Sequence, residues 1–359
     1  MSFDVRAAFH RVRDSLSAIV QIVAAAIAAY AFAHVLLGHE NPFLSVTVCI
    51  SSLSLARDAR PRRVLDTALG ITFGVVLANI SLLLVGRGMW QLVLVLGLVI
   101  LMARFVHRSP GFAVSAGIQA SLVQLIPITS GSEIQRPIDA VVGGAMALAA
   151  TAIVPRDARR LAKSDERALV QQLGGGIRLI EAALHHGDAD RAERALEHLR
   201  ATDRMLSDWN TSLESAKAIA TISPFVRQHL KDIERQREVR VALDYSVRNA
   251  RVVARRVWQL LAEEESPRPQ LARTFEEIAI GIGELEAAVD DPDALVQARQ
   301  SLTLAIVRLH PASHDIEYDV QDATVLMQCR PLLVDLLTAA GLTVEEARER
   351  LPDVDQEPI

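Results

Sequence analysis

The first 155 residues contain no lysine and only seven acidic residues, against eleven arginines. The rest of the chain carries 27 basic and 36 acidic side chains, so the two parts have net charges of about +4 and −9. For a chain of 359 residues we expect two domains, and the change in composition predicts residues 1–155 and 156–359, divided near Pro155. Because the second part is acidic and has no basic patch, the sequence argues against a nucleic-acid-binding protein.

Cysteine and catalytic motifs are scarce as well. Cys49 and Cys329 fall in different parts of the chain, so we expect two buried reduced thiols and no structural disulfide. The three glycines at 174–176 lack the surroundings of a phosphate-binding loop, and we interpret them as a weak point in a helix. The histidines after residue 180 lack metal-ligand spacing, and no nucleophile stands beside a base. The sequence therefore predicts no enzyme, no metal site and no cofactor.

Long apolar runs fill the first part of the chain. A membrane-spanning helix needs about 20 mostly apolar residues. The predicted segments are 16–37, 43–56, 64–86, 89–106, 110–128 and 137–154. The first run exceeds the apolar core of a typical signal peptide, so we interpret it as a membrane helix and not as a cleaved leader. The fold class predicted is all-α, with six transmembrane helices followed by a cytoplasmic helical bundle.

Arginines give these segments an orientation. If the N-terminus is cytoplasmic, nine arginines lie in inside loops and only Arg87 and Arg136 lie in outside loops. This positive-inside bias places the N-terminus and residues 156–359 in the cytoplasm. Arginine also outnumbers lysine by 35 to 3, which hints at a GC-rich bacterial genome. We therefore expect a multi-pass protein in the lipid bilayer of a bacterial inner membrane.

A short internal repeat suggests a transporter architecture. Arg63-Val-Leu-Asp66-Thr-Ala-Leu-Gly70 recurs 73 residues later as Arg136-Pro-Ile-Asp139-Ala-Val-Val-Gly143, and each copy opens a membrane segment. A shift of 73 residues roughly lays segments one to three over segments four to six. Since three is an odd number, the second copy must cross the membrane in the opposite direction. The sequence thus predicts a three-plus-three inverted repeat, with a translocation site near the midplane.

The middle segment of each copy has a proline at its entrance and carries polar side chains, and the first of them, 43–56, is only about 14 residues long. Ser45 and Thr47 lie in the first of these segments, and Gln119 and Gln124 lie in the second. Such segments are typical of substrate pathways in transporters. Polar side chains also bond routinely across helix interfaces, so pathway and packing roles remain equally open here.

Two readings also apply to the repeated arginine and aspartate. A carboxylate in the first turn of a helix is favoured by the helix dipole, and each aspartate can pair with the arginine three residues before it. Alternatively, the Arg63–Asp66 and Arg136–Asp139 pairs guard opposite mouths of the pathway, since ionisable groups near hydrocarbon commonly mark function. Near the outer end of the first segment, His34 can act as a proton relay or simply bond to a loop.

The second part of the chain shows a helical pattern throughout. Its longest predicted helix covers about residues 225–264. Along it, apolar residues step by four and three to form a narrow seam, namely Leu243, Val247, Ala250, Ala254, Val257 and Leu261. This pattern predicts a helical bundle and argues against a catalytic α/β domain.

The chain resembles the fusaric acid resistance-like proteins, also called aromatic acid exporters, in three features. These are the six membrane segments, the R-V-L-D-T-A-L-G opening of the third segment, and the helix from Asp244 to Trp258 (DYSVRNARVVARRVW). Plant aluminium-activated malate transporters are similar in layout. The resemblance implies export of organic, often aromatic, carboxylate anions, with possible coupling to protons. It carries over only to Arg63 and Asp66 among the site residues. Because longer members of the family hold two such halves, it also implies that this chain works as a homodimer.

We therefore expect a secondary exporter of small organic carboxylate anions. A passive anion channel is the first alternative, because it would use the same positive inner face. A membrane-anchored interaction protein is the second, and under this reading the polar residues of segments two and five would tolerate apolar substitution.

Overall fold

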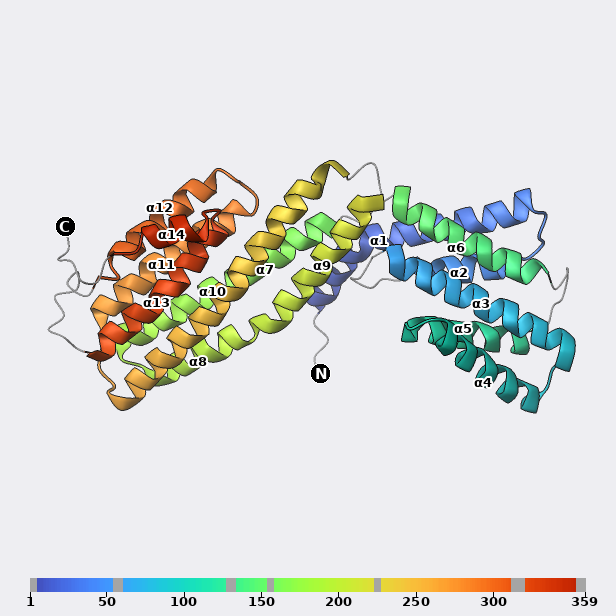
Figure 1. Ribbon diagram of the computed structural model, residues 1–359, viewed down its shortest axis with the longest axis horizontal. Coiled ribbons are helices and arrows are strands. Elements are labelled where there is room, and N and C mark those ends of the chain that lie inside the picture. The colour runs from blue at the N-terminus through green and yellow to red at the C-terminus, as the bar shows by residue number, and fades with distance from the viewer. Residues whose placement is uncertain are drawn as a thin grey trace. The chain divides into compact units, whose positions relative to one another are not determined.

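The computed structural model describes residues 5–53, 61–126, 134–153, 158–222, 227–310 and 320–352, and the regular structure within these ranges is helical (Figure 1). The prediction of an all-α protein is therefore confirmed. The chain divides into two compact units, Met1–Ala158 with Glu214–Leu230 and Arg159–Leu213 with Lys231–Ile359. The boundary predicted near Pro155 lies outside the described residues.

Each of the six predicted segments overlaps one helix of the first unit. These helices are α1 (Val5–Ala31, continued by a π-helical turn, Phe32–Leu36), α2 (Phe43–Leu53), α3 (Pro61–Val85), α4 (Met89–Val106), α5 (Pro110–Leu125) and α6 (Gln135–Ile153). Within the described residues, four apolar stretches are long enough to cross a membrane: Ala18–Leu36, Arg62–Val85, Met89–Val106 and Gln135–Ile153. Helices α2 and α5 have 11 and 16 residues and are therefore short for a complete span.

The six helices pack in crossed pairs. Helix α3 packs most extensively against α5, and α6 packs most extensively against α2. Glycines allow these contacts, because a Cβ atom on Gly74 would lie 2.2 Å from the carbonyl oxygen of Ala116, and one on Gly143 would lie 2.3 Å from that of Ser45. Small residues at such crossings let helix backbones approach closely, as is common in membranes.

Large apolar side chains cover much of the outside of the first unit. On α4, for example, Trp90, Leu101 and Phe105 are 62%, 65% and 86% exposed. A soluble protein rarely leaves so much contiguous apolar surface in water. Together with the long apolar helices, this surface indicates a membrane protein.

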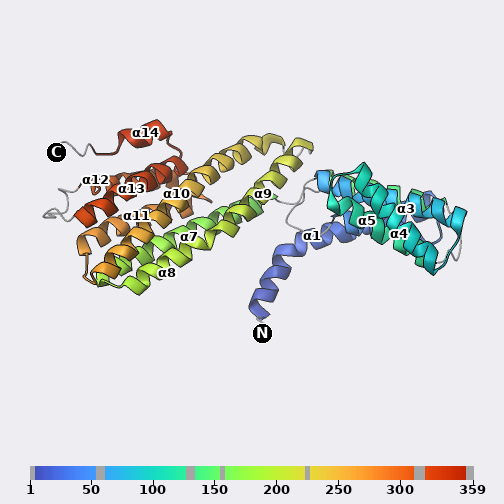
Figure 2. The same cartoon turned by 60° about the horizontal axis from the view of Figure 1, so that its bottom comes forward.

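The second unit contains most of the remaining helices, and within it α7, α10 and the part of α9 up to Leu213 run alongside one another in both views (Figures 1 and 2). The helices after residue 157 are α7 (Ala158–His186), α8 (Ala189–Arg200), α9 (Thr202–Ile222), α10 (Leu230–Glu263), α11 (Pro269–Ala288), α12 (Ala294–Val307), α13 (Val320–Ala339) and α14 (Val344–Glu349). The six residues of the predicted apolar seam all lie on α10 and are buried, which confirms that helix and its buried face.

Bulky side chains fill the core of the second unit. Trp209 and Phe275 are fully buried, as are many leucines of the same unit. The glycines at 174–176 lie within α7, as predicted, and a weak point in this helix stays a prediction. They give α8 room to approach, because a Cβ atom on Gly176 would lie 2.5 Å from Cδ2 of Leu199. Cys49 and Cys329 are both free and fully buried, as the sequence predicts.

Candidate functional site

Helix α5 buries two amide side chains inside the first unit. Gln119 is 2% exposed and Gln124 is 6% exposed. Among the described residues, both amide atoms of Gln124 and the Oε1 atom of Gln119 are buried without a hydrogen-bond partner. A buried polar group without a partner costs free energy, so each such group in a native protein calls for an explanation. These amides are therefore the strongest candidates for groups that contact a polar ligand in this unit.

The hydroxyls predicted on α2 have local partners. Ser45 is fully buried and its Oγ donates to the carbonyl oxygen of Pro42 at 2.7 Å. Thr47 donates to the carbonyl oxygen of Phe43 at 2.7 Å, within the same helix. One turn beyond them, Ser52 is buried, and its Oγ has no hydrogen-bond partner among the described residues. Helices α2 and α5 therefore each bring an unsatisfied polar group into the interior of the unit.

Asp139 lies near the start of α6, and its carboxylate is paired with a histidine from the segment that precedes α2. Its Oδ1 atom lies 2.7 Å from Nδ1 of His39, and the two residues are only 5% and 7% exposed. The carbonyl oxygen of His39 in turn lies 2.8 Å from Nδ1 of His34. Because a carbonyl can only accept, His34 must donate from Nδ1. His34 itself lies in the π-helical turn that ends α1, a feature frequent at functional sites.

The carboxylate of Asp66, near the start of α3, faces a second histidine. Its Oδ1 atom lies 3.6 Å from Nε2 of His107, and their side chains are 24% and 34% exposed. The backbone N–H of Ser109 points at Nδ1 of His107 over 3.2 Å, so Nδ1 accepts and the ring proton is on Nε2, facing Asp66. The imidazole also stacks on the ring of Phe112, which helps to fix its orientation.

Each of the two carboxylates thus forms an ion pair with a histidine from another segment, and the pairing of each aspartate with the arginine before it stays a prediction. Arg136 donates to the carbonyl oxygens of Val123 and Ile126, at 3.0 and 2.7 Å. Cationic side chains commonly satisfy the last carbonyls of a helix in this way. Arg63 lies exposed at the start of α3.

The two His–Asp pairs stand apart from each other. Helices α3 and α6 run in opposite directions (Figure 1), and each aspartate lies near the start of its helix, so the pairs lie at opposite ends of the unit. Of the predicted site residues, the structure thus separates Asp66 from Asp139 and gives each a partner that the sequence did not single out. The shift of 73 residues that relates the aspartates also relates His34 to His107, which was an available signal for His107 but not for His39.

Within the described residues, no group of three or more histidine, cysteine or acidic side chains is placed to hold a metal ion. The polar groups that are assembled in the first unit are amides, hydroxyls and His–Asp pairs. Such groups can bind and release an anion or a proton.

Comparisons with known proteins agree with this description. A protein of Corynebacterium glutamicum, described as uncharacterized, is 27% identical over 355 residues, which cover 97% of this chain and 91% of that protein. Residues 23–150 match a family model described as fusaric acid resistance protein-like. The matched residues include the whole of α2, α3 and α5 and most of α6, which carry the polar groups described above. They also include both His–Asp pairs. The resemblance predicted from the sequence is thus confirmed, and the first unit of this membrane protein is similar to a family of membrane transporters.

Proposed function

We propose that the protein is a secondary exporter of small organic carboxylate anions, aromatic ones included, that works as a homodimer in a bacterial inner membrane. The observation that carries this proposal is the pair of buried amides on α5, Gln119 and Gln124. An amide N–H₂ group can donate to a carboxylate, and an apolar interior around it suits an aromatic ring. The family match of residues 23–150 supports transport, and the arginine bias supports a cytoplasmic second unit.

The proposal includes the three-plus-three inverted repeat. The crossed packing supports it, because α3 of the first half packs on α5 of the second, and α6 of the second packs on α2 of the first. The ion pairs support it as well, because Asp66 of the first half meets His107 of the second and Asp139 of the second meets His39 of the first. Both exchanges are what a pseudo-two-fold axis in the membrane plane would produce.

In this mechanism the two His–Asp pairs act as gates at opposite ends of the pathway. With the N-terminus in the cytoplasm, the buried 2.7 Å pair of His39 and Asp139 closes the outer end. The looser 3.6 Å pair of His107 and Asp66 lies at the inner end, where an anion would enter. Protonation of Asp139 from outside would remove the charge that holds His39. A proton entering from the outside would therefore open that end and let the anion leave.

The test is transport of 4-hydroxybenzoate across liposomes containing the purified protein, with and without an imposed pH gradient. Uphill movement driven by the gradient is the expected result. Gln124→Leu should reduce this flux at least about tenfold, because the anion loses a donor worth about 1.4 kcal/mol or more in the membrane interior. Ser121→Ala is the matched control on the same helix, since the Ser121 hydroxyl bonds to its own backbone at Ile118 and is exposed there.

Asp66→Asn and Asp139→Asn should each abolish gradient-driven flux while the protein still inserts and purifies as a single species. Flux that follows voltage alone and ignores the pH gradient would replace the exporter with a passive anion channel. If the wild-type protein moves none of several organic anions, and Gln124→Leu does not differ from it in any other measured property, a membrane-anchored interaction protein would be favoured.

A further inference from the structure

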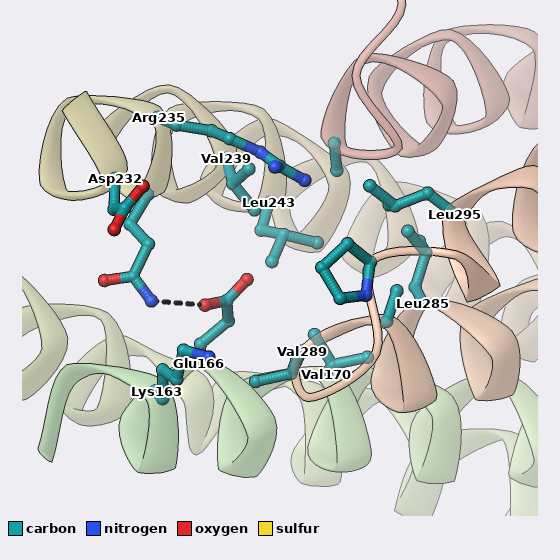
Figure 3. Close-up of a pocket in the computed structure, with 14 residues that line it drawn as sticks. Lys163, Glu166, Val170, Asp232, Arg235, Val239, Leu243, Leu285, Val289 and Leu295 are labelled. Carbon is teal, nitrogen blue, oxygen red and sulfur yellow. Dashed lines mark hydrogen bonds between the residues drawn. The ribbon is translucent and has the colours of Figure 1, made fainter. Parts of the chain in front are cut away.

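A pocket in the second unit has the properties of a small-molecule site. It encloses a volume of about 240 Å³ between α7, α10 and the turn that joins α11 to α12 (Figure 3). An engineered cavity of about 150 Å³ lined by apolar side chains is known to hold benzene, so this pocket has room for one aromatic ring and a substituent.

Apolar side chains from four helices and the adjoining turn form the inner wall of the pocket. They include Val170 of α7, Leu243 of α10, Leu285 of α11, Val289 just after it and Leu295 of α12 (Figure 3). A surface of this kind binds a ring by removing apolar area from water, at about 25 cal/mol per Å². The apolar wall does not select a ligand by its charge, so any charge selection depends on the polar residues at the other side of the pocket.

Polar groups gather on the side of α7 and α10. The carboxyl group of Glu166 points into the pocket, and its Oε2 accepts a 3.0 Å hydrogen bond from Nε2 of Gln236 (Figure 3). Lys163 and Arg235 line the same side as exposed cations, with the exposed Asp232 as the only other charged residue in the lining. When Glu166 is protonated, the lining therefore carries one net positive charge. When Glu166 is ionised, that charge is cancelled.

The protonation state of Glu166 is set by opposing influences. Burial raises its pKa to about 7, against the hydrogen bond from Gln236 and the positive charges of Lys163, Arg235 and Arg167, which lower it. Arg167 is itself paired with Asp290, and the lining residues from α11, α12 and α13 are uncharged. At neutral pH the carboxyl group is thus close to half protonated, and in that form its O–H can donate to a ligand carboxylate.

We infer that this pocket binds a small monocyclic carboxylic acid in its anionic form. The ring occupies the apolar wall, and the carboxylate meets Arg235 and the protonated carboxyl group of Glu166. This site is distinct from the amides of the first unit. Binding here does not depend on whether the protein transports its ligand.

The probe is benzoate, added to the full-length protein in detergent, with hydrogen exchange followed by mass spectrometry across the whole chain. Benzoate should slow exchange in the peptides that contain residues 163–170 and 232–243, and affinity should be about tenfold higher at pH 6 than at pH 8. That ratio follows from the protonated fraction of a group with a pKa of about 7. Peptides of α5 report separately on binding in the first unit, so the two sites are read in one experiment.

Variants make the assignment falsifiable. Glu166→Gln, which keeps a donor at every pH, should abolish the pH dependence, and Arg235→Gln should weaken binding about tenfold, as expected for the loss of one charge-assisted contact. Ala288→Leu should fill the pocket and remove the protection, while Glu193→Gln, at an exposed position on α8, should change nothing. Lack of protection at saturating benzoate, protection that survives Ala288→Leu, or tighter binding of benzylamine than of benzoate would each overturn the inference.

Discussion

The helices of the two units pack through different kinds of side chain. In the first unit, glycine and alanine lie at the crossings, and a Cβ atom on Gly74 would come within 2.2 Å of a neighbouring backbone oxygen. In the second unit, Trp209, Phe275 and a large set of leucines and isoleucines fill the space between helices. One chain therefore contains both a core of close backbone contacts and a core of bulky side chains.

The proposed placement of the first unit in lipid and of the second in water would produce this difference. In lipid, apolar side chains gain little by leaving the solvent, so helices associate through close van der Waals contact between small residues. In water, the removal of apolar area drives packing, and large side chains contribute the most. We therefore expect the first unit to be intolerant of added volume and the second to be intolerant of lost volume.

The largest effect is expected from Gly74→Ala. The added methyl group would overlap the backbone of Ala116, which cannot yield as a flexible side chain can, so the cost should reach about 3 kcal/mol or more. The yield of monodisperse protein in detergent, measured by size-exclusion chromatography, should fall sharply. Gly97→Ala is the control, because a Cβ atom there meets nothing within 4 Å. Equal yields of the two variants would show that backbone contact does not hold the first unit together.

Removal of volume from the second unit comes next. Phe275→Ala should cost about 3–5 kcal/mol, because Phe275 is fully buried and its removal leaves a cavity. Leu304→Ala on the neighbouring α12 should cost less than about 0.5 kcal/mol, since Leu304 is 64% exposed. Denaturant unfolding of the full chain, followed by hydrogen exchange in peptides of α10 and α11, measures both. Similar costs for the two variants would contradict a core of bulky side chains.

A pH dependence should distinguish the second unit further. Because burial raises the pKa of Glu166 from 4.5 to about 7, the folded state binds this proton more tightly than the unfolded chain. The contribution of this group to the free energy of unfolding is fully present below about pH 4.5. It is lost as the pH rises to about 7, and the loss is at most about 3 kcal/mol. Denaturant unfolding at several pH values should show this fall in wild type. Glu166→Gln should remove that contribution, and a slope identical in both proteins would disprove it.

The smallest effect is expected at a helix terminus. Thr343 and Glu346 form a capping box at the start of α14, with each side chain bonded to the other's backbone N–H. Thr343→Ala should therefore cost about 1 kcal/mol. Thr211→Ala, whose hydroxyl bonds only to the carbonyl oxygen of Ser207 in its own helix, should cost less in the same unfolding assay. A larger loss at Thr211 than at Thr343 would argue against the cap.

The sequence predicted what depends on local periodicity. The apolar runs located the helices α1 to α6, and α4 begins and ends at the predicted residues 89 and 106. The seam of α10 was likewise found from spacing alone. Both features follow from the period of a helix and the length of an apolar run, which neighbouring residues determine.

Tertiary partners could not be predicted in the same way. The histidine partners of the aspartates lie far away in the chain, because His39 is 100 residues from Asp139 and His107 is 41 residues from Asp66. Such pairs depend on which helices cross, and periodicity does not encode this. The π-helical turn at Phe32–Leu36 was not predicted either, because its residues also suit an α-helix.

The burial of both native thiols has a practical consequence. Cys49 and Cys329 are fully buried, and burial raises the pKa of the Cys329 thiol to about 12, so very little of the reactive thiolate forms at neutral pH. A cysteine introduced on the surface should therefore be the first thiol to react with a maleimide. Fluorophores or spin labels can thus be attached to the wild-type background, and distances across either end of the first unit can be followed during turnover.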